Sequence, residues 1–232
     1  MSYAHALAWL SLAAGGLSAA IVIVDLCRRP QPMAIMNLVW PLTATFGTVP
    51  LLAFYLWRGR APLRGRRPTS GDTPMPIAVA TGALHCGAGC ALGDVFAELL
   101  LLAAPGLAGA LGLGVLFHDR VVAAWILDFG FALAFGIAFQ FFALPLPRRG
   151  KLLVGLAAAA KADALSLTAW QVGMYGGMAP GLFVVGPHLL GGRPTAAEPE
   201  FWWFMQGAML VGFATSYPVN WWLIRRGVKT PM

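Results

Sequence analysis

Charged residues are scarce in this chain. They make up 11% of its 232 residues, whereas hydrophobic residues make up 59%. A soluble domain usually carries about 25% charged and about 45–50% apolar residues. A chain of this length cannot bury so much apolar surface in one water-soluble core. The composition therefore excludes an ordinary soluble domain and indicates an integral membrane protein.

Cysteines and known catalytic motifs are also few. Three cysteines are too few for a scaffold held by disulfides. The chain has no Walker loop, dinucleotide fingerprint, nucleophile elbow, HExxH or haem-attachment motif, which argues against ATP-driven transport by this chain alone. Whether it is an enzyme stays open. The net charge of +7 comes from basic residues at the ends of apolar runs, so we expect no nucleic-acid partner.

Long apolar runs, by contrast, are abundant. A membrane-spanning helix needs about 20 apolar residues, and six runs reach that length between segments rich in Arg, Pro and Gly. They predict an all-α polytopic bundle in which residues 1–232 form a single transmembrane domain. We expect Pro41 and Pro50 to kink the second span. The predicted spans are residues 4–26, 33–57, 77–103, 121–144, 152–178 and 201–224.

The basic residues also predict an orientation. The loops after the second and fourth spans, together with the C-terminal segment, carry eleven Lys and Arg residues, against four in the other loops. Cytoplasmic loops are enriched in Lys and Arg. Six spans would then place both termini in the cytoplasm.

The third predicted span holds the densest polar group. Cys86, Cys90, Asp94 and Glu98 follow one another at intervals of four, and His85 lies beside the first. Each interval turns only about 40° beyond a full circle on a helix, so the four side chains form one gently winding stripe. Ionisable side chains in hydrocarbon cost at least a few kcal/mol and usually mark function.

Two thiols and an imidazole favour a soft metal ion, copper or zinc in particular. The stripe therefore predicts binding or transport of such an ion, with His85, Cys86, Cys90 and Asp94 as candidate ligands. Buried cysteine is also an ordinary small hydrophobe, so packing is the competing interpretation. Six methionines near the outer ends of their spans could line a pathway to the site: Met33, Met36, Met174, Met178, Met205 and Met209.

A second polar group lies on the fifth predicted span. Lys161 and Asp163 are two residues apart and point in different directions, so each needs a partner on another helix. Lys161 could neutralise Asp94 or Asp128, and Asp163 could accept a hydrogen bond from His85 or carry a proton. The candidates for an ion pathway or proton coupling are Glu98, Asp128, Lys161 and Asp163.

Other functions stay open at this point. Cys86 and Cys90 could cycle between dithiol and disulfide in a membrane redox protein, although a disulfide at this spacing on a regular helix would be strained. Alternatively, Lys161 and Asp163 could serve as charge partners in a small-solute transporter, or the chain could be a structural subunit. The expected partners are the lipid bilayer and a metal ion or small solute. A homo-oligomer is compatible with the sequence.

Several segments resemble one family. They include Met36–Pro41, Lys161–Leu167, His85-Cys86-Gly87-Ala88-Gly89-Cys90 and Tyr217-Pro218-Val219-Asn220-Trp221-Trp222. Together they resemble the bacterial membrane-protein family catalogued as domain of unknown function 4396. The resemblance implies a multi-pass protein of the bacterial inner membrane, and it implies no established activity.

Overall fold

The chain folds into helices. The computed structural model describes residues 3–62, 73–110, 112, 114–143 and 152–231, and these contain no strand. The predicted all-α class is confirmed. The elements are α1 (Tyr3–Arg28), α2 (Met36–Phe54), the π-helical turn η1 (Tyr55–Gly59), α3 (Met75–Ala103), α4 (Leu107–Ala110), α5 (Arg120–Ala143), α6 (Leu152–Pro180), the π-helical turn η2 (Gly181–Val185), α7 (Gly186–Leu190) and α8 (Pro199–Arg225).

Four of the described helical segments are long and apolar enough to cross a membrane: α1, α2 with η1, α3 and α5. Helices α6 and α8 have 29 and 27 residues, so their length also suffices. They are more polar because their inward faces carry side chains such as Asp163 and Asn220. All six segments begin and end within three residues of the apolar runs from which they were predicted.

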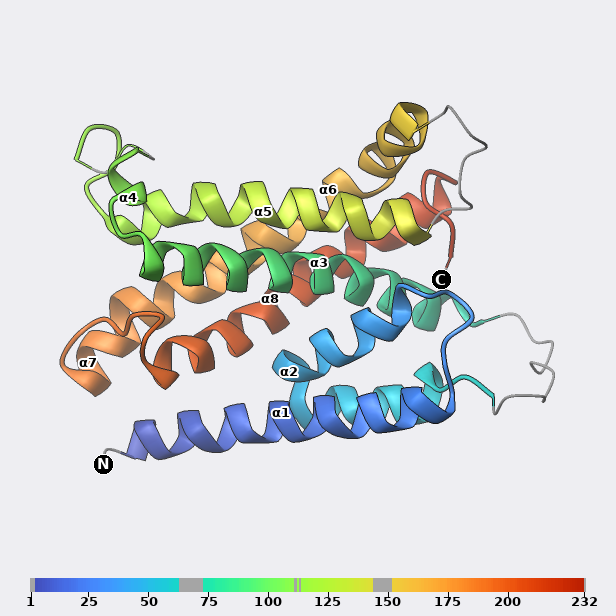
Figure 1. Cartoon of the computed structure of the whole chain (residues 1–232), viewed down its shortest axis with the longest axis horizontal. Coiled ribbons are helices and arrows are strands. Elements are labelled where there is room, and N and C mark those ends of the chain that lie inside the picture. The colour runs from blue at the N-terminus through green and yellow to red at the C-terminus, as the bar shows by residue number, and fades with distance from the viewer. Residues whose placement is uncertain (1–2, 63–72, 111, 113, 144–151, 232) are drawn as a thin grey trace.

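The segment from α2 to η1 folds back on itself. Thr48, two residues before Pro50, has φ 47° and ψ −135°, a non-helical conformation inside α2. The chain reverses there, so that the start of the segment meets its end. Gln31 Nε2 donates a hydrogen bond of 2.8 Å to the carbonyl oxygen of Gly59, and the rings of Trp40 and Tyr55 lie 5.3 Å apart between centroids. We call residues 36–59 the re-entrant hairpin (Figure 1).

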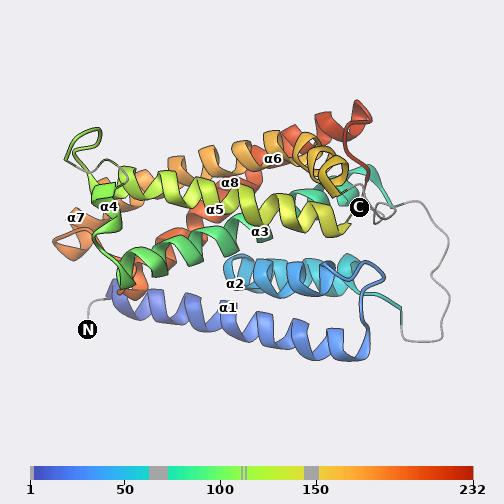
Figure 2. The same ribbon diagram turned by 45° about the horizontal axis from the view of Figure 1, so that its top comes forward.

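The re-entrant hairpin occupies the segment predicted as the second span. Although the segment is long enough to cross a membrane, both of its ends lie at the same end of the bundle. Helices α1, α3, α5, α6 and α8 run along the bundle, and the N- and C-termini lie at opposite ends of it (Figures 1 and 2). This arrangement does not confirm six spans or a common side for both termini, and these stay predictions. Pro50 donates no backbone hydrogen bond and disfavours a helical residue before it, which explains why the break falls here.

Helix α3 is central, because it packs against the re-entrant hairpin, α5, α6 and α8. Small residues allow close approach of its neighbours. A Cβ atom added to Gly89 would lie 2.6 Å from the Cα of Gly136, and one added to Gly93 would lie 2.6 Å from the Cα of Ala132. Helices α3 and α5 are therefore in near backbone contact beside the polar stripe.

We predict that Gly93→Ala loosens the bundle. The new methyl group would lie 2.4 Å from the backbone nitrogen of Ala132, so the helices must separate at a cost of about 1–3 kcal/mol. The matched control is Gly130→Ala on α5, where no atom lies within 4 Å of the added Cβ. Unfolding followed by circular dichroism in detergent measures both variants, and equal stability would contradict the close α3–α5 contact.

Candidate metal centre

The thiol of Cys86 lies at the junction of α3 and α6 and is fully buried. Its single S–H donates to Asp163 Oδ1 at 2.9 Å, and the carbonyl oxygen of Gly82, at 3.2 Å, is the alternative acceptor. Ser166 Oγ, one turn after Asp163 on α6, donates to the sulfur at 3.1 Å. The two polar groups singled out in the sequence thus meet in space.

Lys229 joins this group from the far end of the chain. After α8 ends, Gly227 adopts φ 68°, and the chain turns back so that the Val228 amide donates to the carbonyl of Leu223 at 3.0 Å. The Lys229 side chain then enters the bundle and is 2% exposed. Its Nζ donates to Asp163 Oδ1 at 2.5 Å, to Asn220 Oδ1 at 2.9 Å and to Cys86 Sγ at 3.0 Å.

Two polar residues of α8 complete the network. Asn220 Nδ2 donates to Ser166 Oγ at 2.5 Å and to Ser216 Oγ at 2.9 Å, and the two serine hydroxyls lie 3.1 Å apart. All of these side chains are buried. We call the group the Cys86 cluster, and it consists of Cys86, Asp163, Ser166, Ser216, Asn220 and Lys229.

Lys229 is not among the site residues predicted from the sequence. It follows the last apolar run, where a basic residue usually sets orientation rather than entering the bundle. The available signal was Asp163, which needed a positive partner on another element. Lys161 does not provide it, because its side chain is exposed and forms no ion pair within the described part of the chain.

His85 lies next to the cluster, with the backbone of Phe139 as the nearest polar group of the described chain, and no group there meets hydrogen-bond geometry with its ring nitrogens. Its ring is fully buried and packs edge-on against Phe139, with centroids 6.2 Å apart. Among the described residues neither ring nitrogen has a hydrogen-bond partner, and neither has Asp163 Oδ2. Buried polar atoms in folded proteins are nearly always bonded. The unpartnered atoms therefore suggest that a further group, absent from the protein chain itself, belongs here.

Three side chains are close enough to share one ion. His85, Cys86 and Asp163 each offer one ligand atom, and these atoms lie within 4.8 Å of one another. Imidazole nitrogen, thiolate sulfur and carboxylate oxygen are the ligand types that zinc accepts, and thiolate with imidazole also suits copper. The residues thus fit a transition metal ion.

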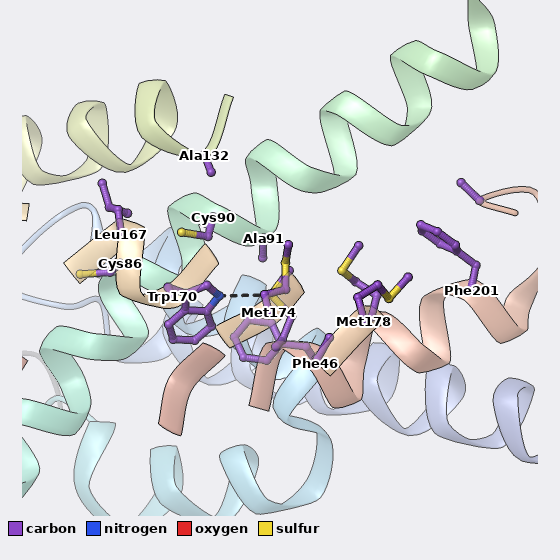
Figure 3. Close-up of a cluster of buried hydrophobic side chains, with 14 of the residues drawn as sticks. Phe46, Cys86, Cys90, Ala91, Ala132, Leu167, Trp170, Met174, Met178 and Phe201 are labelled. Carbon is purple, nitrogen blue, oxygen red and sulfur yellow. Dashed lines mark hydrogen bonds between the residues drawn. The ribbon is translucent and has the colours of Figure 1, made fainter. Parts of the chain in front are cut away.

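The candidate ligands from the sequence divide into two places. His85 and Cys86 lie with Asp163, whereas Cys90 packs in the apolar core near Trp170 and Leu167 (Figure 3). Asp94 accepts a hydrogen bond of 2.9 Å from Gln171 Nε2 instead. The stripe rotates by about 40° per interval, so two turns carry it from one group of neighbours to another.

The pathway candidates also differ in their surroundings. Asp128 is buried on α5, whereas Glu98 is half-buried on α3 and borders a surface cavity. Of the four predicted pathway residues, Asp163 therefore belongs to the Cys86 cluster.

The cluster carries a positive charge supplied by the chain itself. Lys229 belongs to the segment after α8, outside the membrane-spanning helices. Burial lowers the pKa of its ammonium, but Cys86 and Asp163 raise it, and the net direction is upward. The charged ammonium is therefore favoured beside Asp163, with which it forms a salt bridge.

The fold and this cluster define an all-helical protein of the membrane type with a buried histidine, cysteine, aspartate and lysine centre. The chain belongs to the family described as Domain of unknown function (DUF4396), whose model matches residues 77–229. The match begins at α3 and ends at Lys229, so α1 and the re-entrant hairpin lie outside it. No curated protein and no solved structure matches the chain.

We predict that Lys229→Ala destabilises the protein strongly. The substitution leaves the fully buried Asp163 carboxylate without its counter-charge, which typically costs about 3–5 kcal/mol. Lys161→Ala is the matched control, because Lys161 is exposed on the same helix as Asp163. Unfolding in detergent by circular dichroism compares the two variants. Equal effects would show that Lys229 is not bound in the bundle.

Proposed function

We propose that this chain is a multi-pass membrane protein that binds a soft transition metal ion, copper(I) above all, through His85, Cys86 and Asp163. The observation that carries this proposal is His85, a fully buried imidazole with no hydrogen-bond partner for either nitrogen among the described residues, beside a thiol and a carboxylate. A metal ion would supply the partner that the ring lacks.

The cluster can accept an ion without losing its charge balance. The Cys86 thiol must give up its proton to become a ligand, and the net charge stays the same when that proton leaves the cluster as a monovalent cation enters. Asp163 Oδ1, which already accepts the hydrogen bond of the thiol, is the nearest base that could pass the proton on and then remain a carboxylate. Asp163 Oδ2 has no hydrogen-bond partner among the described residues and could therefore face the ion. Lys229 competes with the ion for Cys86 and Asp163, so we expect binding to shift the C-terminal segment.

The surrounding core favours a soft ion. One buried cluster between α3, α6 and α8 contains six sulfur-bearing side chains: Cys86, Cys90, Met174, Met178, Met205 and Met209. Figure 3 shows Cys86, Cys90, Met174 and Met178 in succession toward Phe201. Thioether sulfur binds copper(I) and discriminates against hard cations. The row of sulfurs supports movement of the ion along the bundle, which is transport rather than storage alone.

The alternatives receive less support. A disulfide between Cys86 and Cys90 would need local unwinding, but α3 is helical throughout Met75–Ala103. Gly87 makes room for the Trp170 ring there, since an added Cβ would lie 2.2 Å from it. A small-solute transporter that uses Lys161 and Asp163 as charge partners loses its basis, because Asp163 pairs with Lys229.

We predict that purified protein binds copper(I) and that Cys86→Ser abolishes binding, whereas Cys90→Ser retains it. The two variants are matched, since both remove one buried thiol from the same helix. Titration with copper(I), and in parallel with zinc, followed by elemental analysis measures the stoichiometry. Wild-type protein that takes up neither ion would refute the proposal, and equal loss in both variants would assign the site to the two thiols instead.

The membrane topology follows from the hairpin. We propose five crossings, by α1, α3, α5, α6 and α8, with the re-entrant hairpin entering from the end where the C-terminus lies. Arginines at that end of the bundle include Arg28, Arg29, Arg58, Arg60, Arg225 and Arg226, against Arg120 and Arg193 at the other. The positive-inside rule then supports a cytoplasmic C-terminus and an external N-terminus in a bacterial inner membrane.

The exposed thiol of Cys27 tests this topology. It lies at the end of α1, which is cytoplasmic with five crossings but external with six spans and cytoplasmic termini. We predict that a membrane-impermeant maleimide labels Cys27 in inverted vesicles and not in intact spheroplasts. Cys27→Ser is the control for labelling elsewhere. Labelling from outside would favour six spans.

A further inference from the structure

A second buried polar group lies farther along α3, away from the Cys86 cluster. Three of its oxygen atoms have no hydrogen-bond donor among the described residues: Asp94 Oδ2 on α3, Asp128 Oδ1 on α5 and Gln171 Oε1 on α6. All three side chains are at most 1% exposed. We call them the carboxyl pair and its glutamine.

These side chains belong to one group. Gln171 Nε2 donates to Asp94 Oδ1 at 2.9 Å, which holds the amide, and hence its free oxygen, beside Asp94. Asp128 interacts electrostatically with Asp94. The near contact of Gly93 with Ala132 brings α3 and α5 together beside Asp94 and one turn from Asp128.

Within the described part of the chain, the nearby donors make their hydrogen bonds to other atoms. The Tyr175 hydroxyl donates to the carbonyl oxygen of Trp125 at 2.8 Å. Arg120 donates to the carbonyl oxygen of Leu101 at 3.1 Å. The Gln171 amide donates a hydrogen bond to Asp94 Oδ1. The three open oxygens therefore need a donor that the neutral and basic side chains around them do not provide.

A protonated carboxyl group supplies that donor. Two carboxylates buried near each other, with no hydrogen-bonded cation among the described residues, disfavour double ionisation, because desolvation and mutual repulsion act against the charged form. A carboxylic acid carries an O–H that can donate to the other carboxyl or to an amide oxygen. We propose that Asp94 and Asp128 form a proton-binding site oriented by Gln171, separate from the metal centre and independent of whether a metal binds there.

Glu98 connects this site with the surface. It follows Asp94 by one turn of α3, is half-buried, and borders a cavity of about 470 Å³ that is also lined by His118, Asp119, Arg120 and Arg193. A proton entering this cavity reaches Glu98 first and the carboxyl pair next.

The titratable groups around the site come from each element packed on it. On α3 they are Cys90 and Glu98, on α5 Arg120, and on α6 Tyr175. On α8 the buried carboxylate of Glu200 is bonded to His5 of α1 instead.

Infrared spectroscopy tests the proposal directly. In lipid nanodiscs at neutral pH we expect the wild-type protein to show the C=O band of a protonated aspartic acid, which shifts on carbon-13 labelling of aspartate and on transfer to D2O. We expect Asp94→Asn with Asp128→Asn to lose the band. Glu200→Gln, which alters a buried carboxyl that has a partner, should keep it. Glu98→Gln should keep the band and slow its shift in D2O.

Each infrared result either supports or contradicts the proposed proton site. A wild-type spectrum without a protonated aspartate band would overturn the proposal, and this needs no variant to fold. A band that survives in the double variant would place the proton on another residue, and this would also overturn the proposal. If the double variant does not fold, the same comparison is made with Asp94→Asn and Asp128→Asn singly. A band that neither substitution shifts or removes contradicts the site.

Discussion

The interior of this bundle is organised around one buried ion pair, between Lys229 and Asp163. Removing two charges from water is costly unless their remaining hydrogen-bonding capacity is satisfied. All three protons of the ammonium are used here, on Asp163, Asn220 and Cys86. The pair also ties the segment after α8 to α6, two elements far apart in the chain. The positions of Cys86, Ser166 and Ser216 follow from this pair, because each hydrogen-bonds within the network that satisfies it.

The re-entrant hairpin imposes the second constraint. A non-glycine residue with positive φ, such as Thr48, is uncommon and persists where the surroundings hold it. Two contacts with neighbouring helices hold the hairpin in this structure. Gln206 of α8 donates to the carbonyl oxygen of Thr45 at 2.7 Å, and Asp25 at the end of α1 pairs with Arg60 after the hairpin. Irregular backbone at membrane depth is tolerated when it is buried in protein or lines a cavity. The hairpin is thus a stable part of the bundle.

The sequence predicted the helices well and their three-dimensional relations less well. Helix bounds follow from the length of apolar runs, a local property, and they agree with the structure to within three residues. The fold-back at Thr48 depends on contacts between Gln31 and Gly59, and hydropathy does not encode such contacts. Asp163 was recognised as needing a partner, but only the turn at Gly227 shows that the partner is Lys229. Both failures concern contacts between segments that composition alone does not connect.

The polar stripe of α3 shows why spacing alone could not define one site. Four residues at equal intervals appear equivalent in sequence, but they rotate around the helix as they advance. At Cys86 the stripe faces α6 and the C-terminal segment, where the chain provides its own cation. At Asp94 it faces α5 and α6, where the described residues provide none. The first environment pairs a carboxyl with an ammonium and places a thiol beside them, as the proposed soft-metal site requires. The second, where buried oxygens have no hydrogen-bond donor among the described residues, is the place of the proposed proton site. One helix therefore presents two different chemistries two turns apart, and the neighbouring helices decide which residue belongs to which.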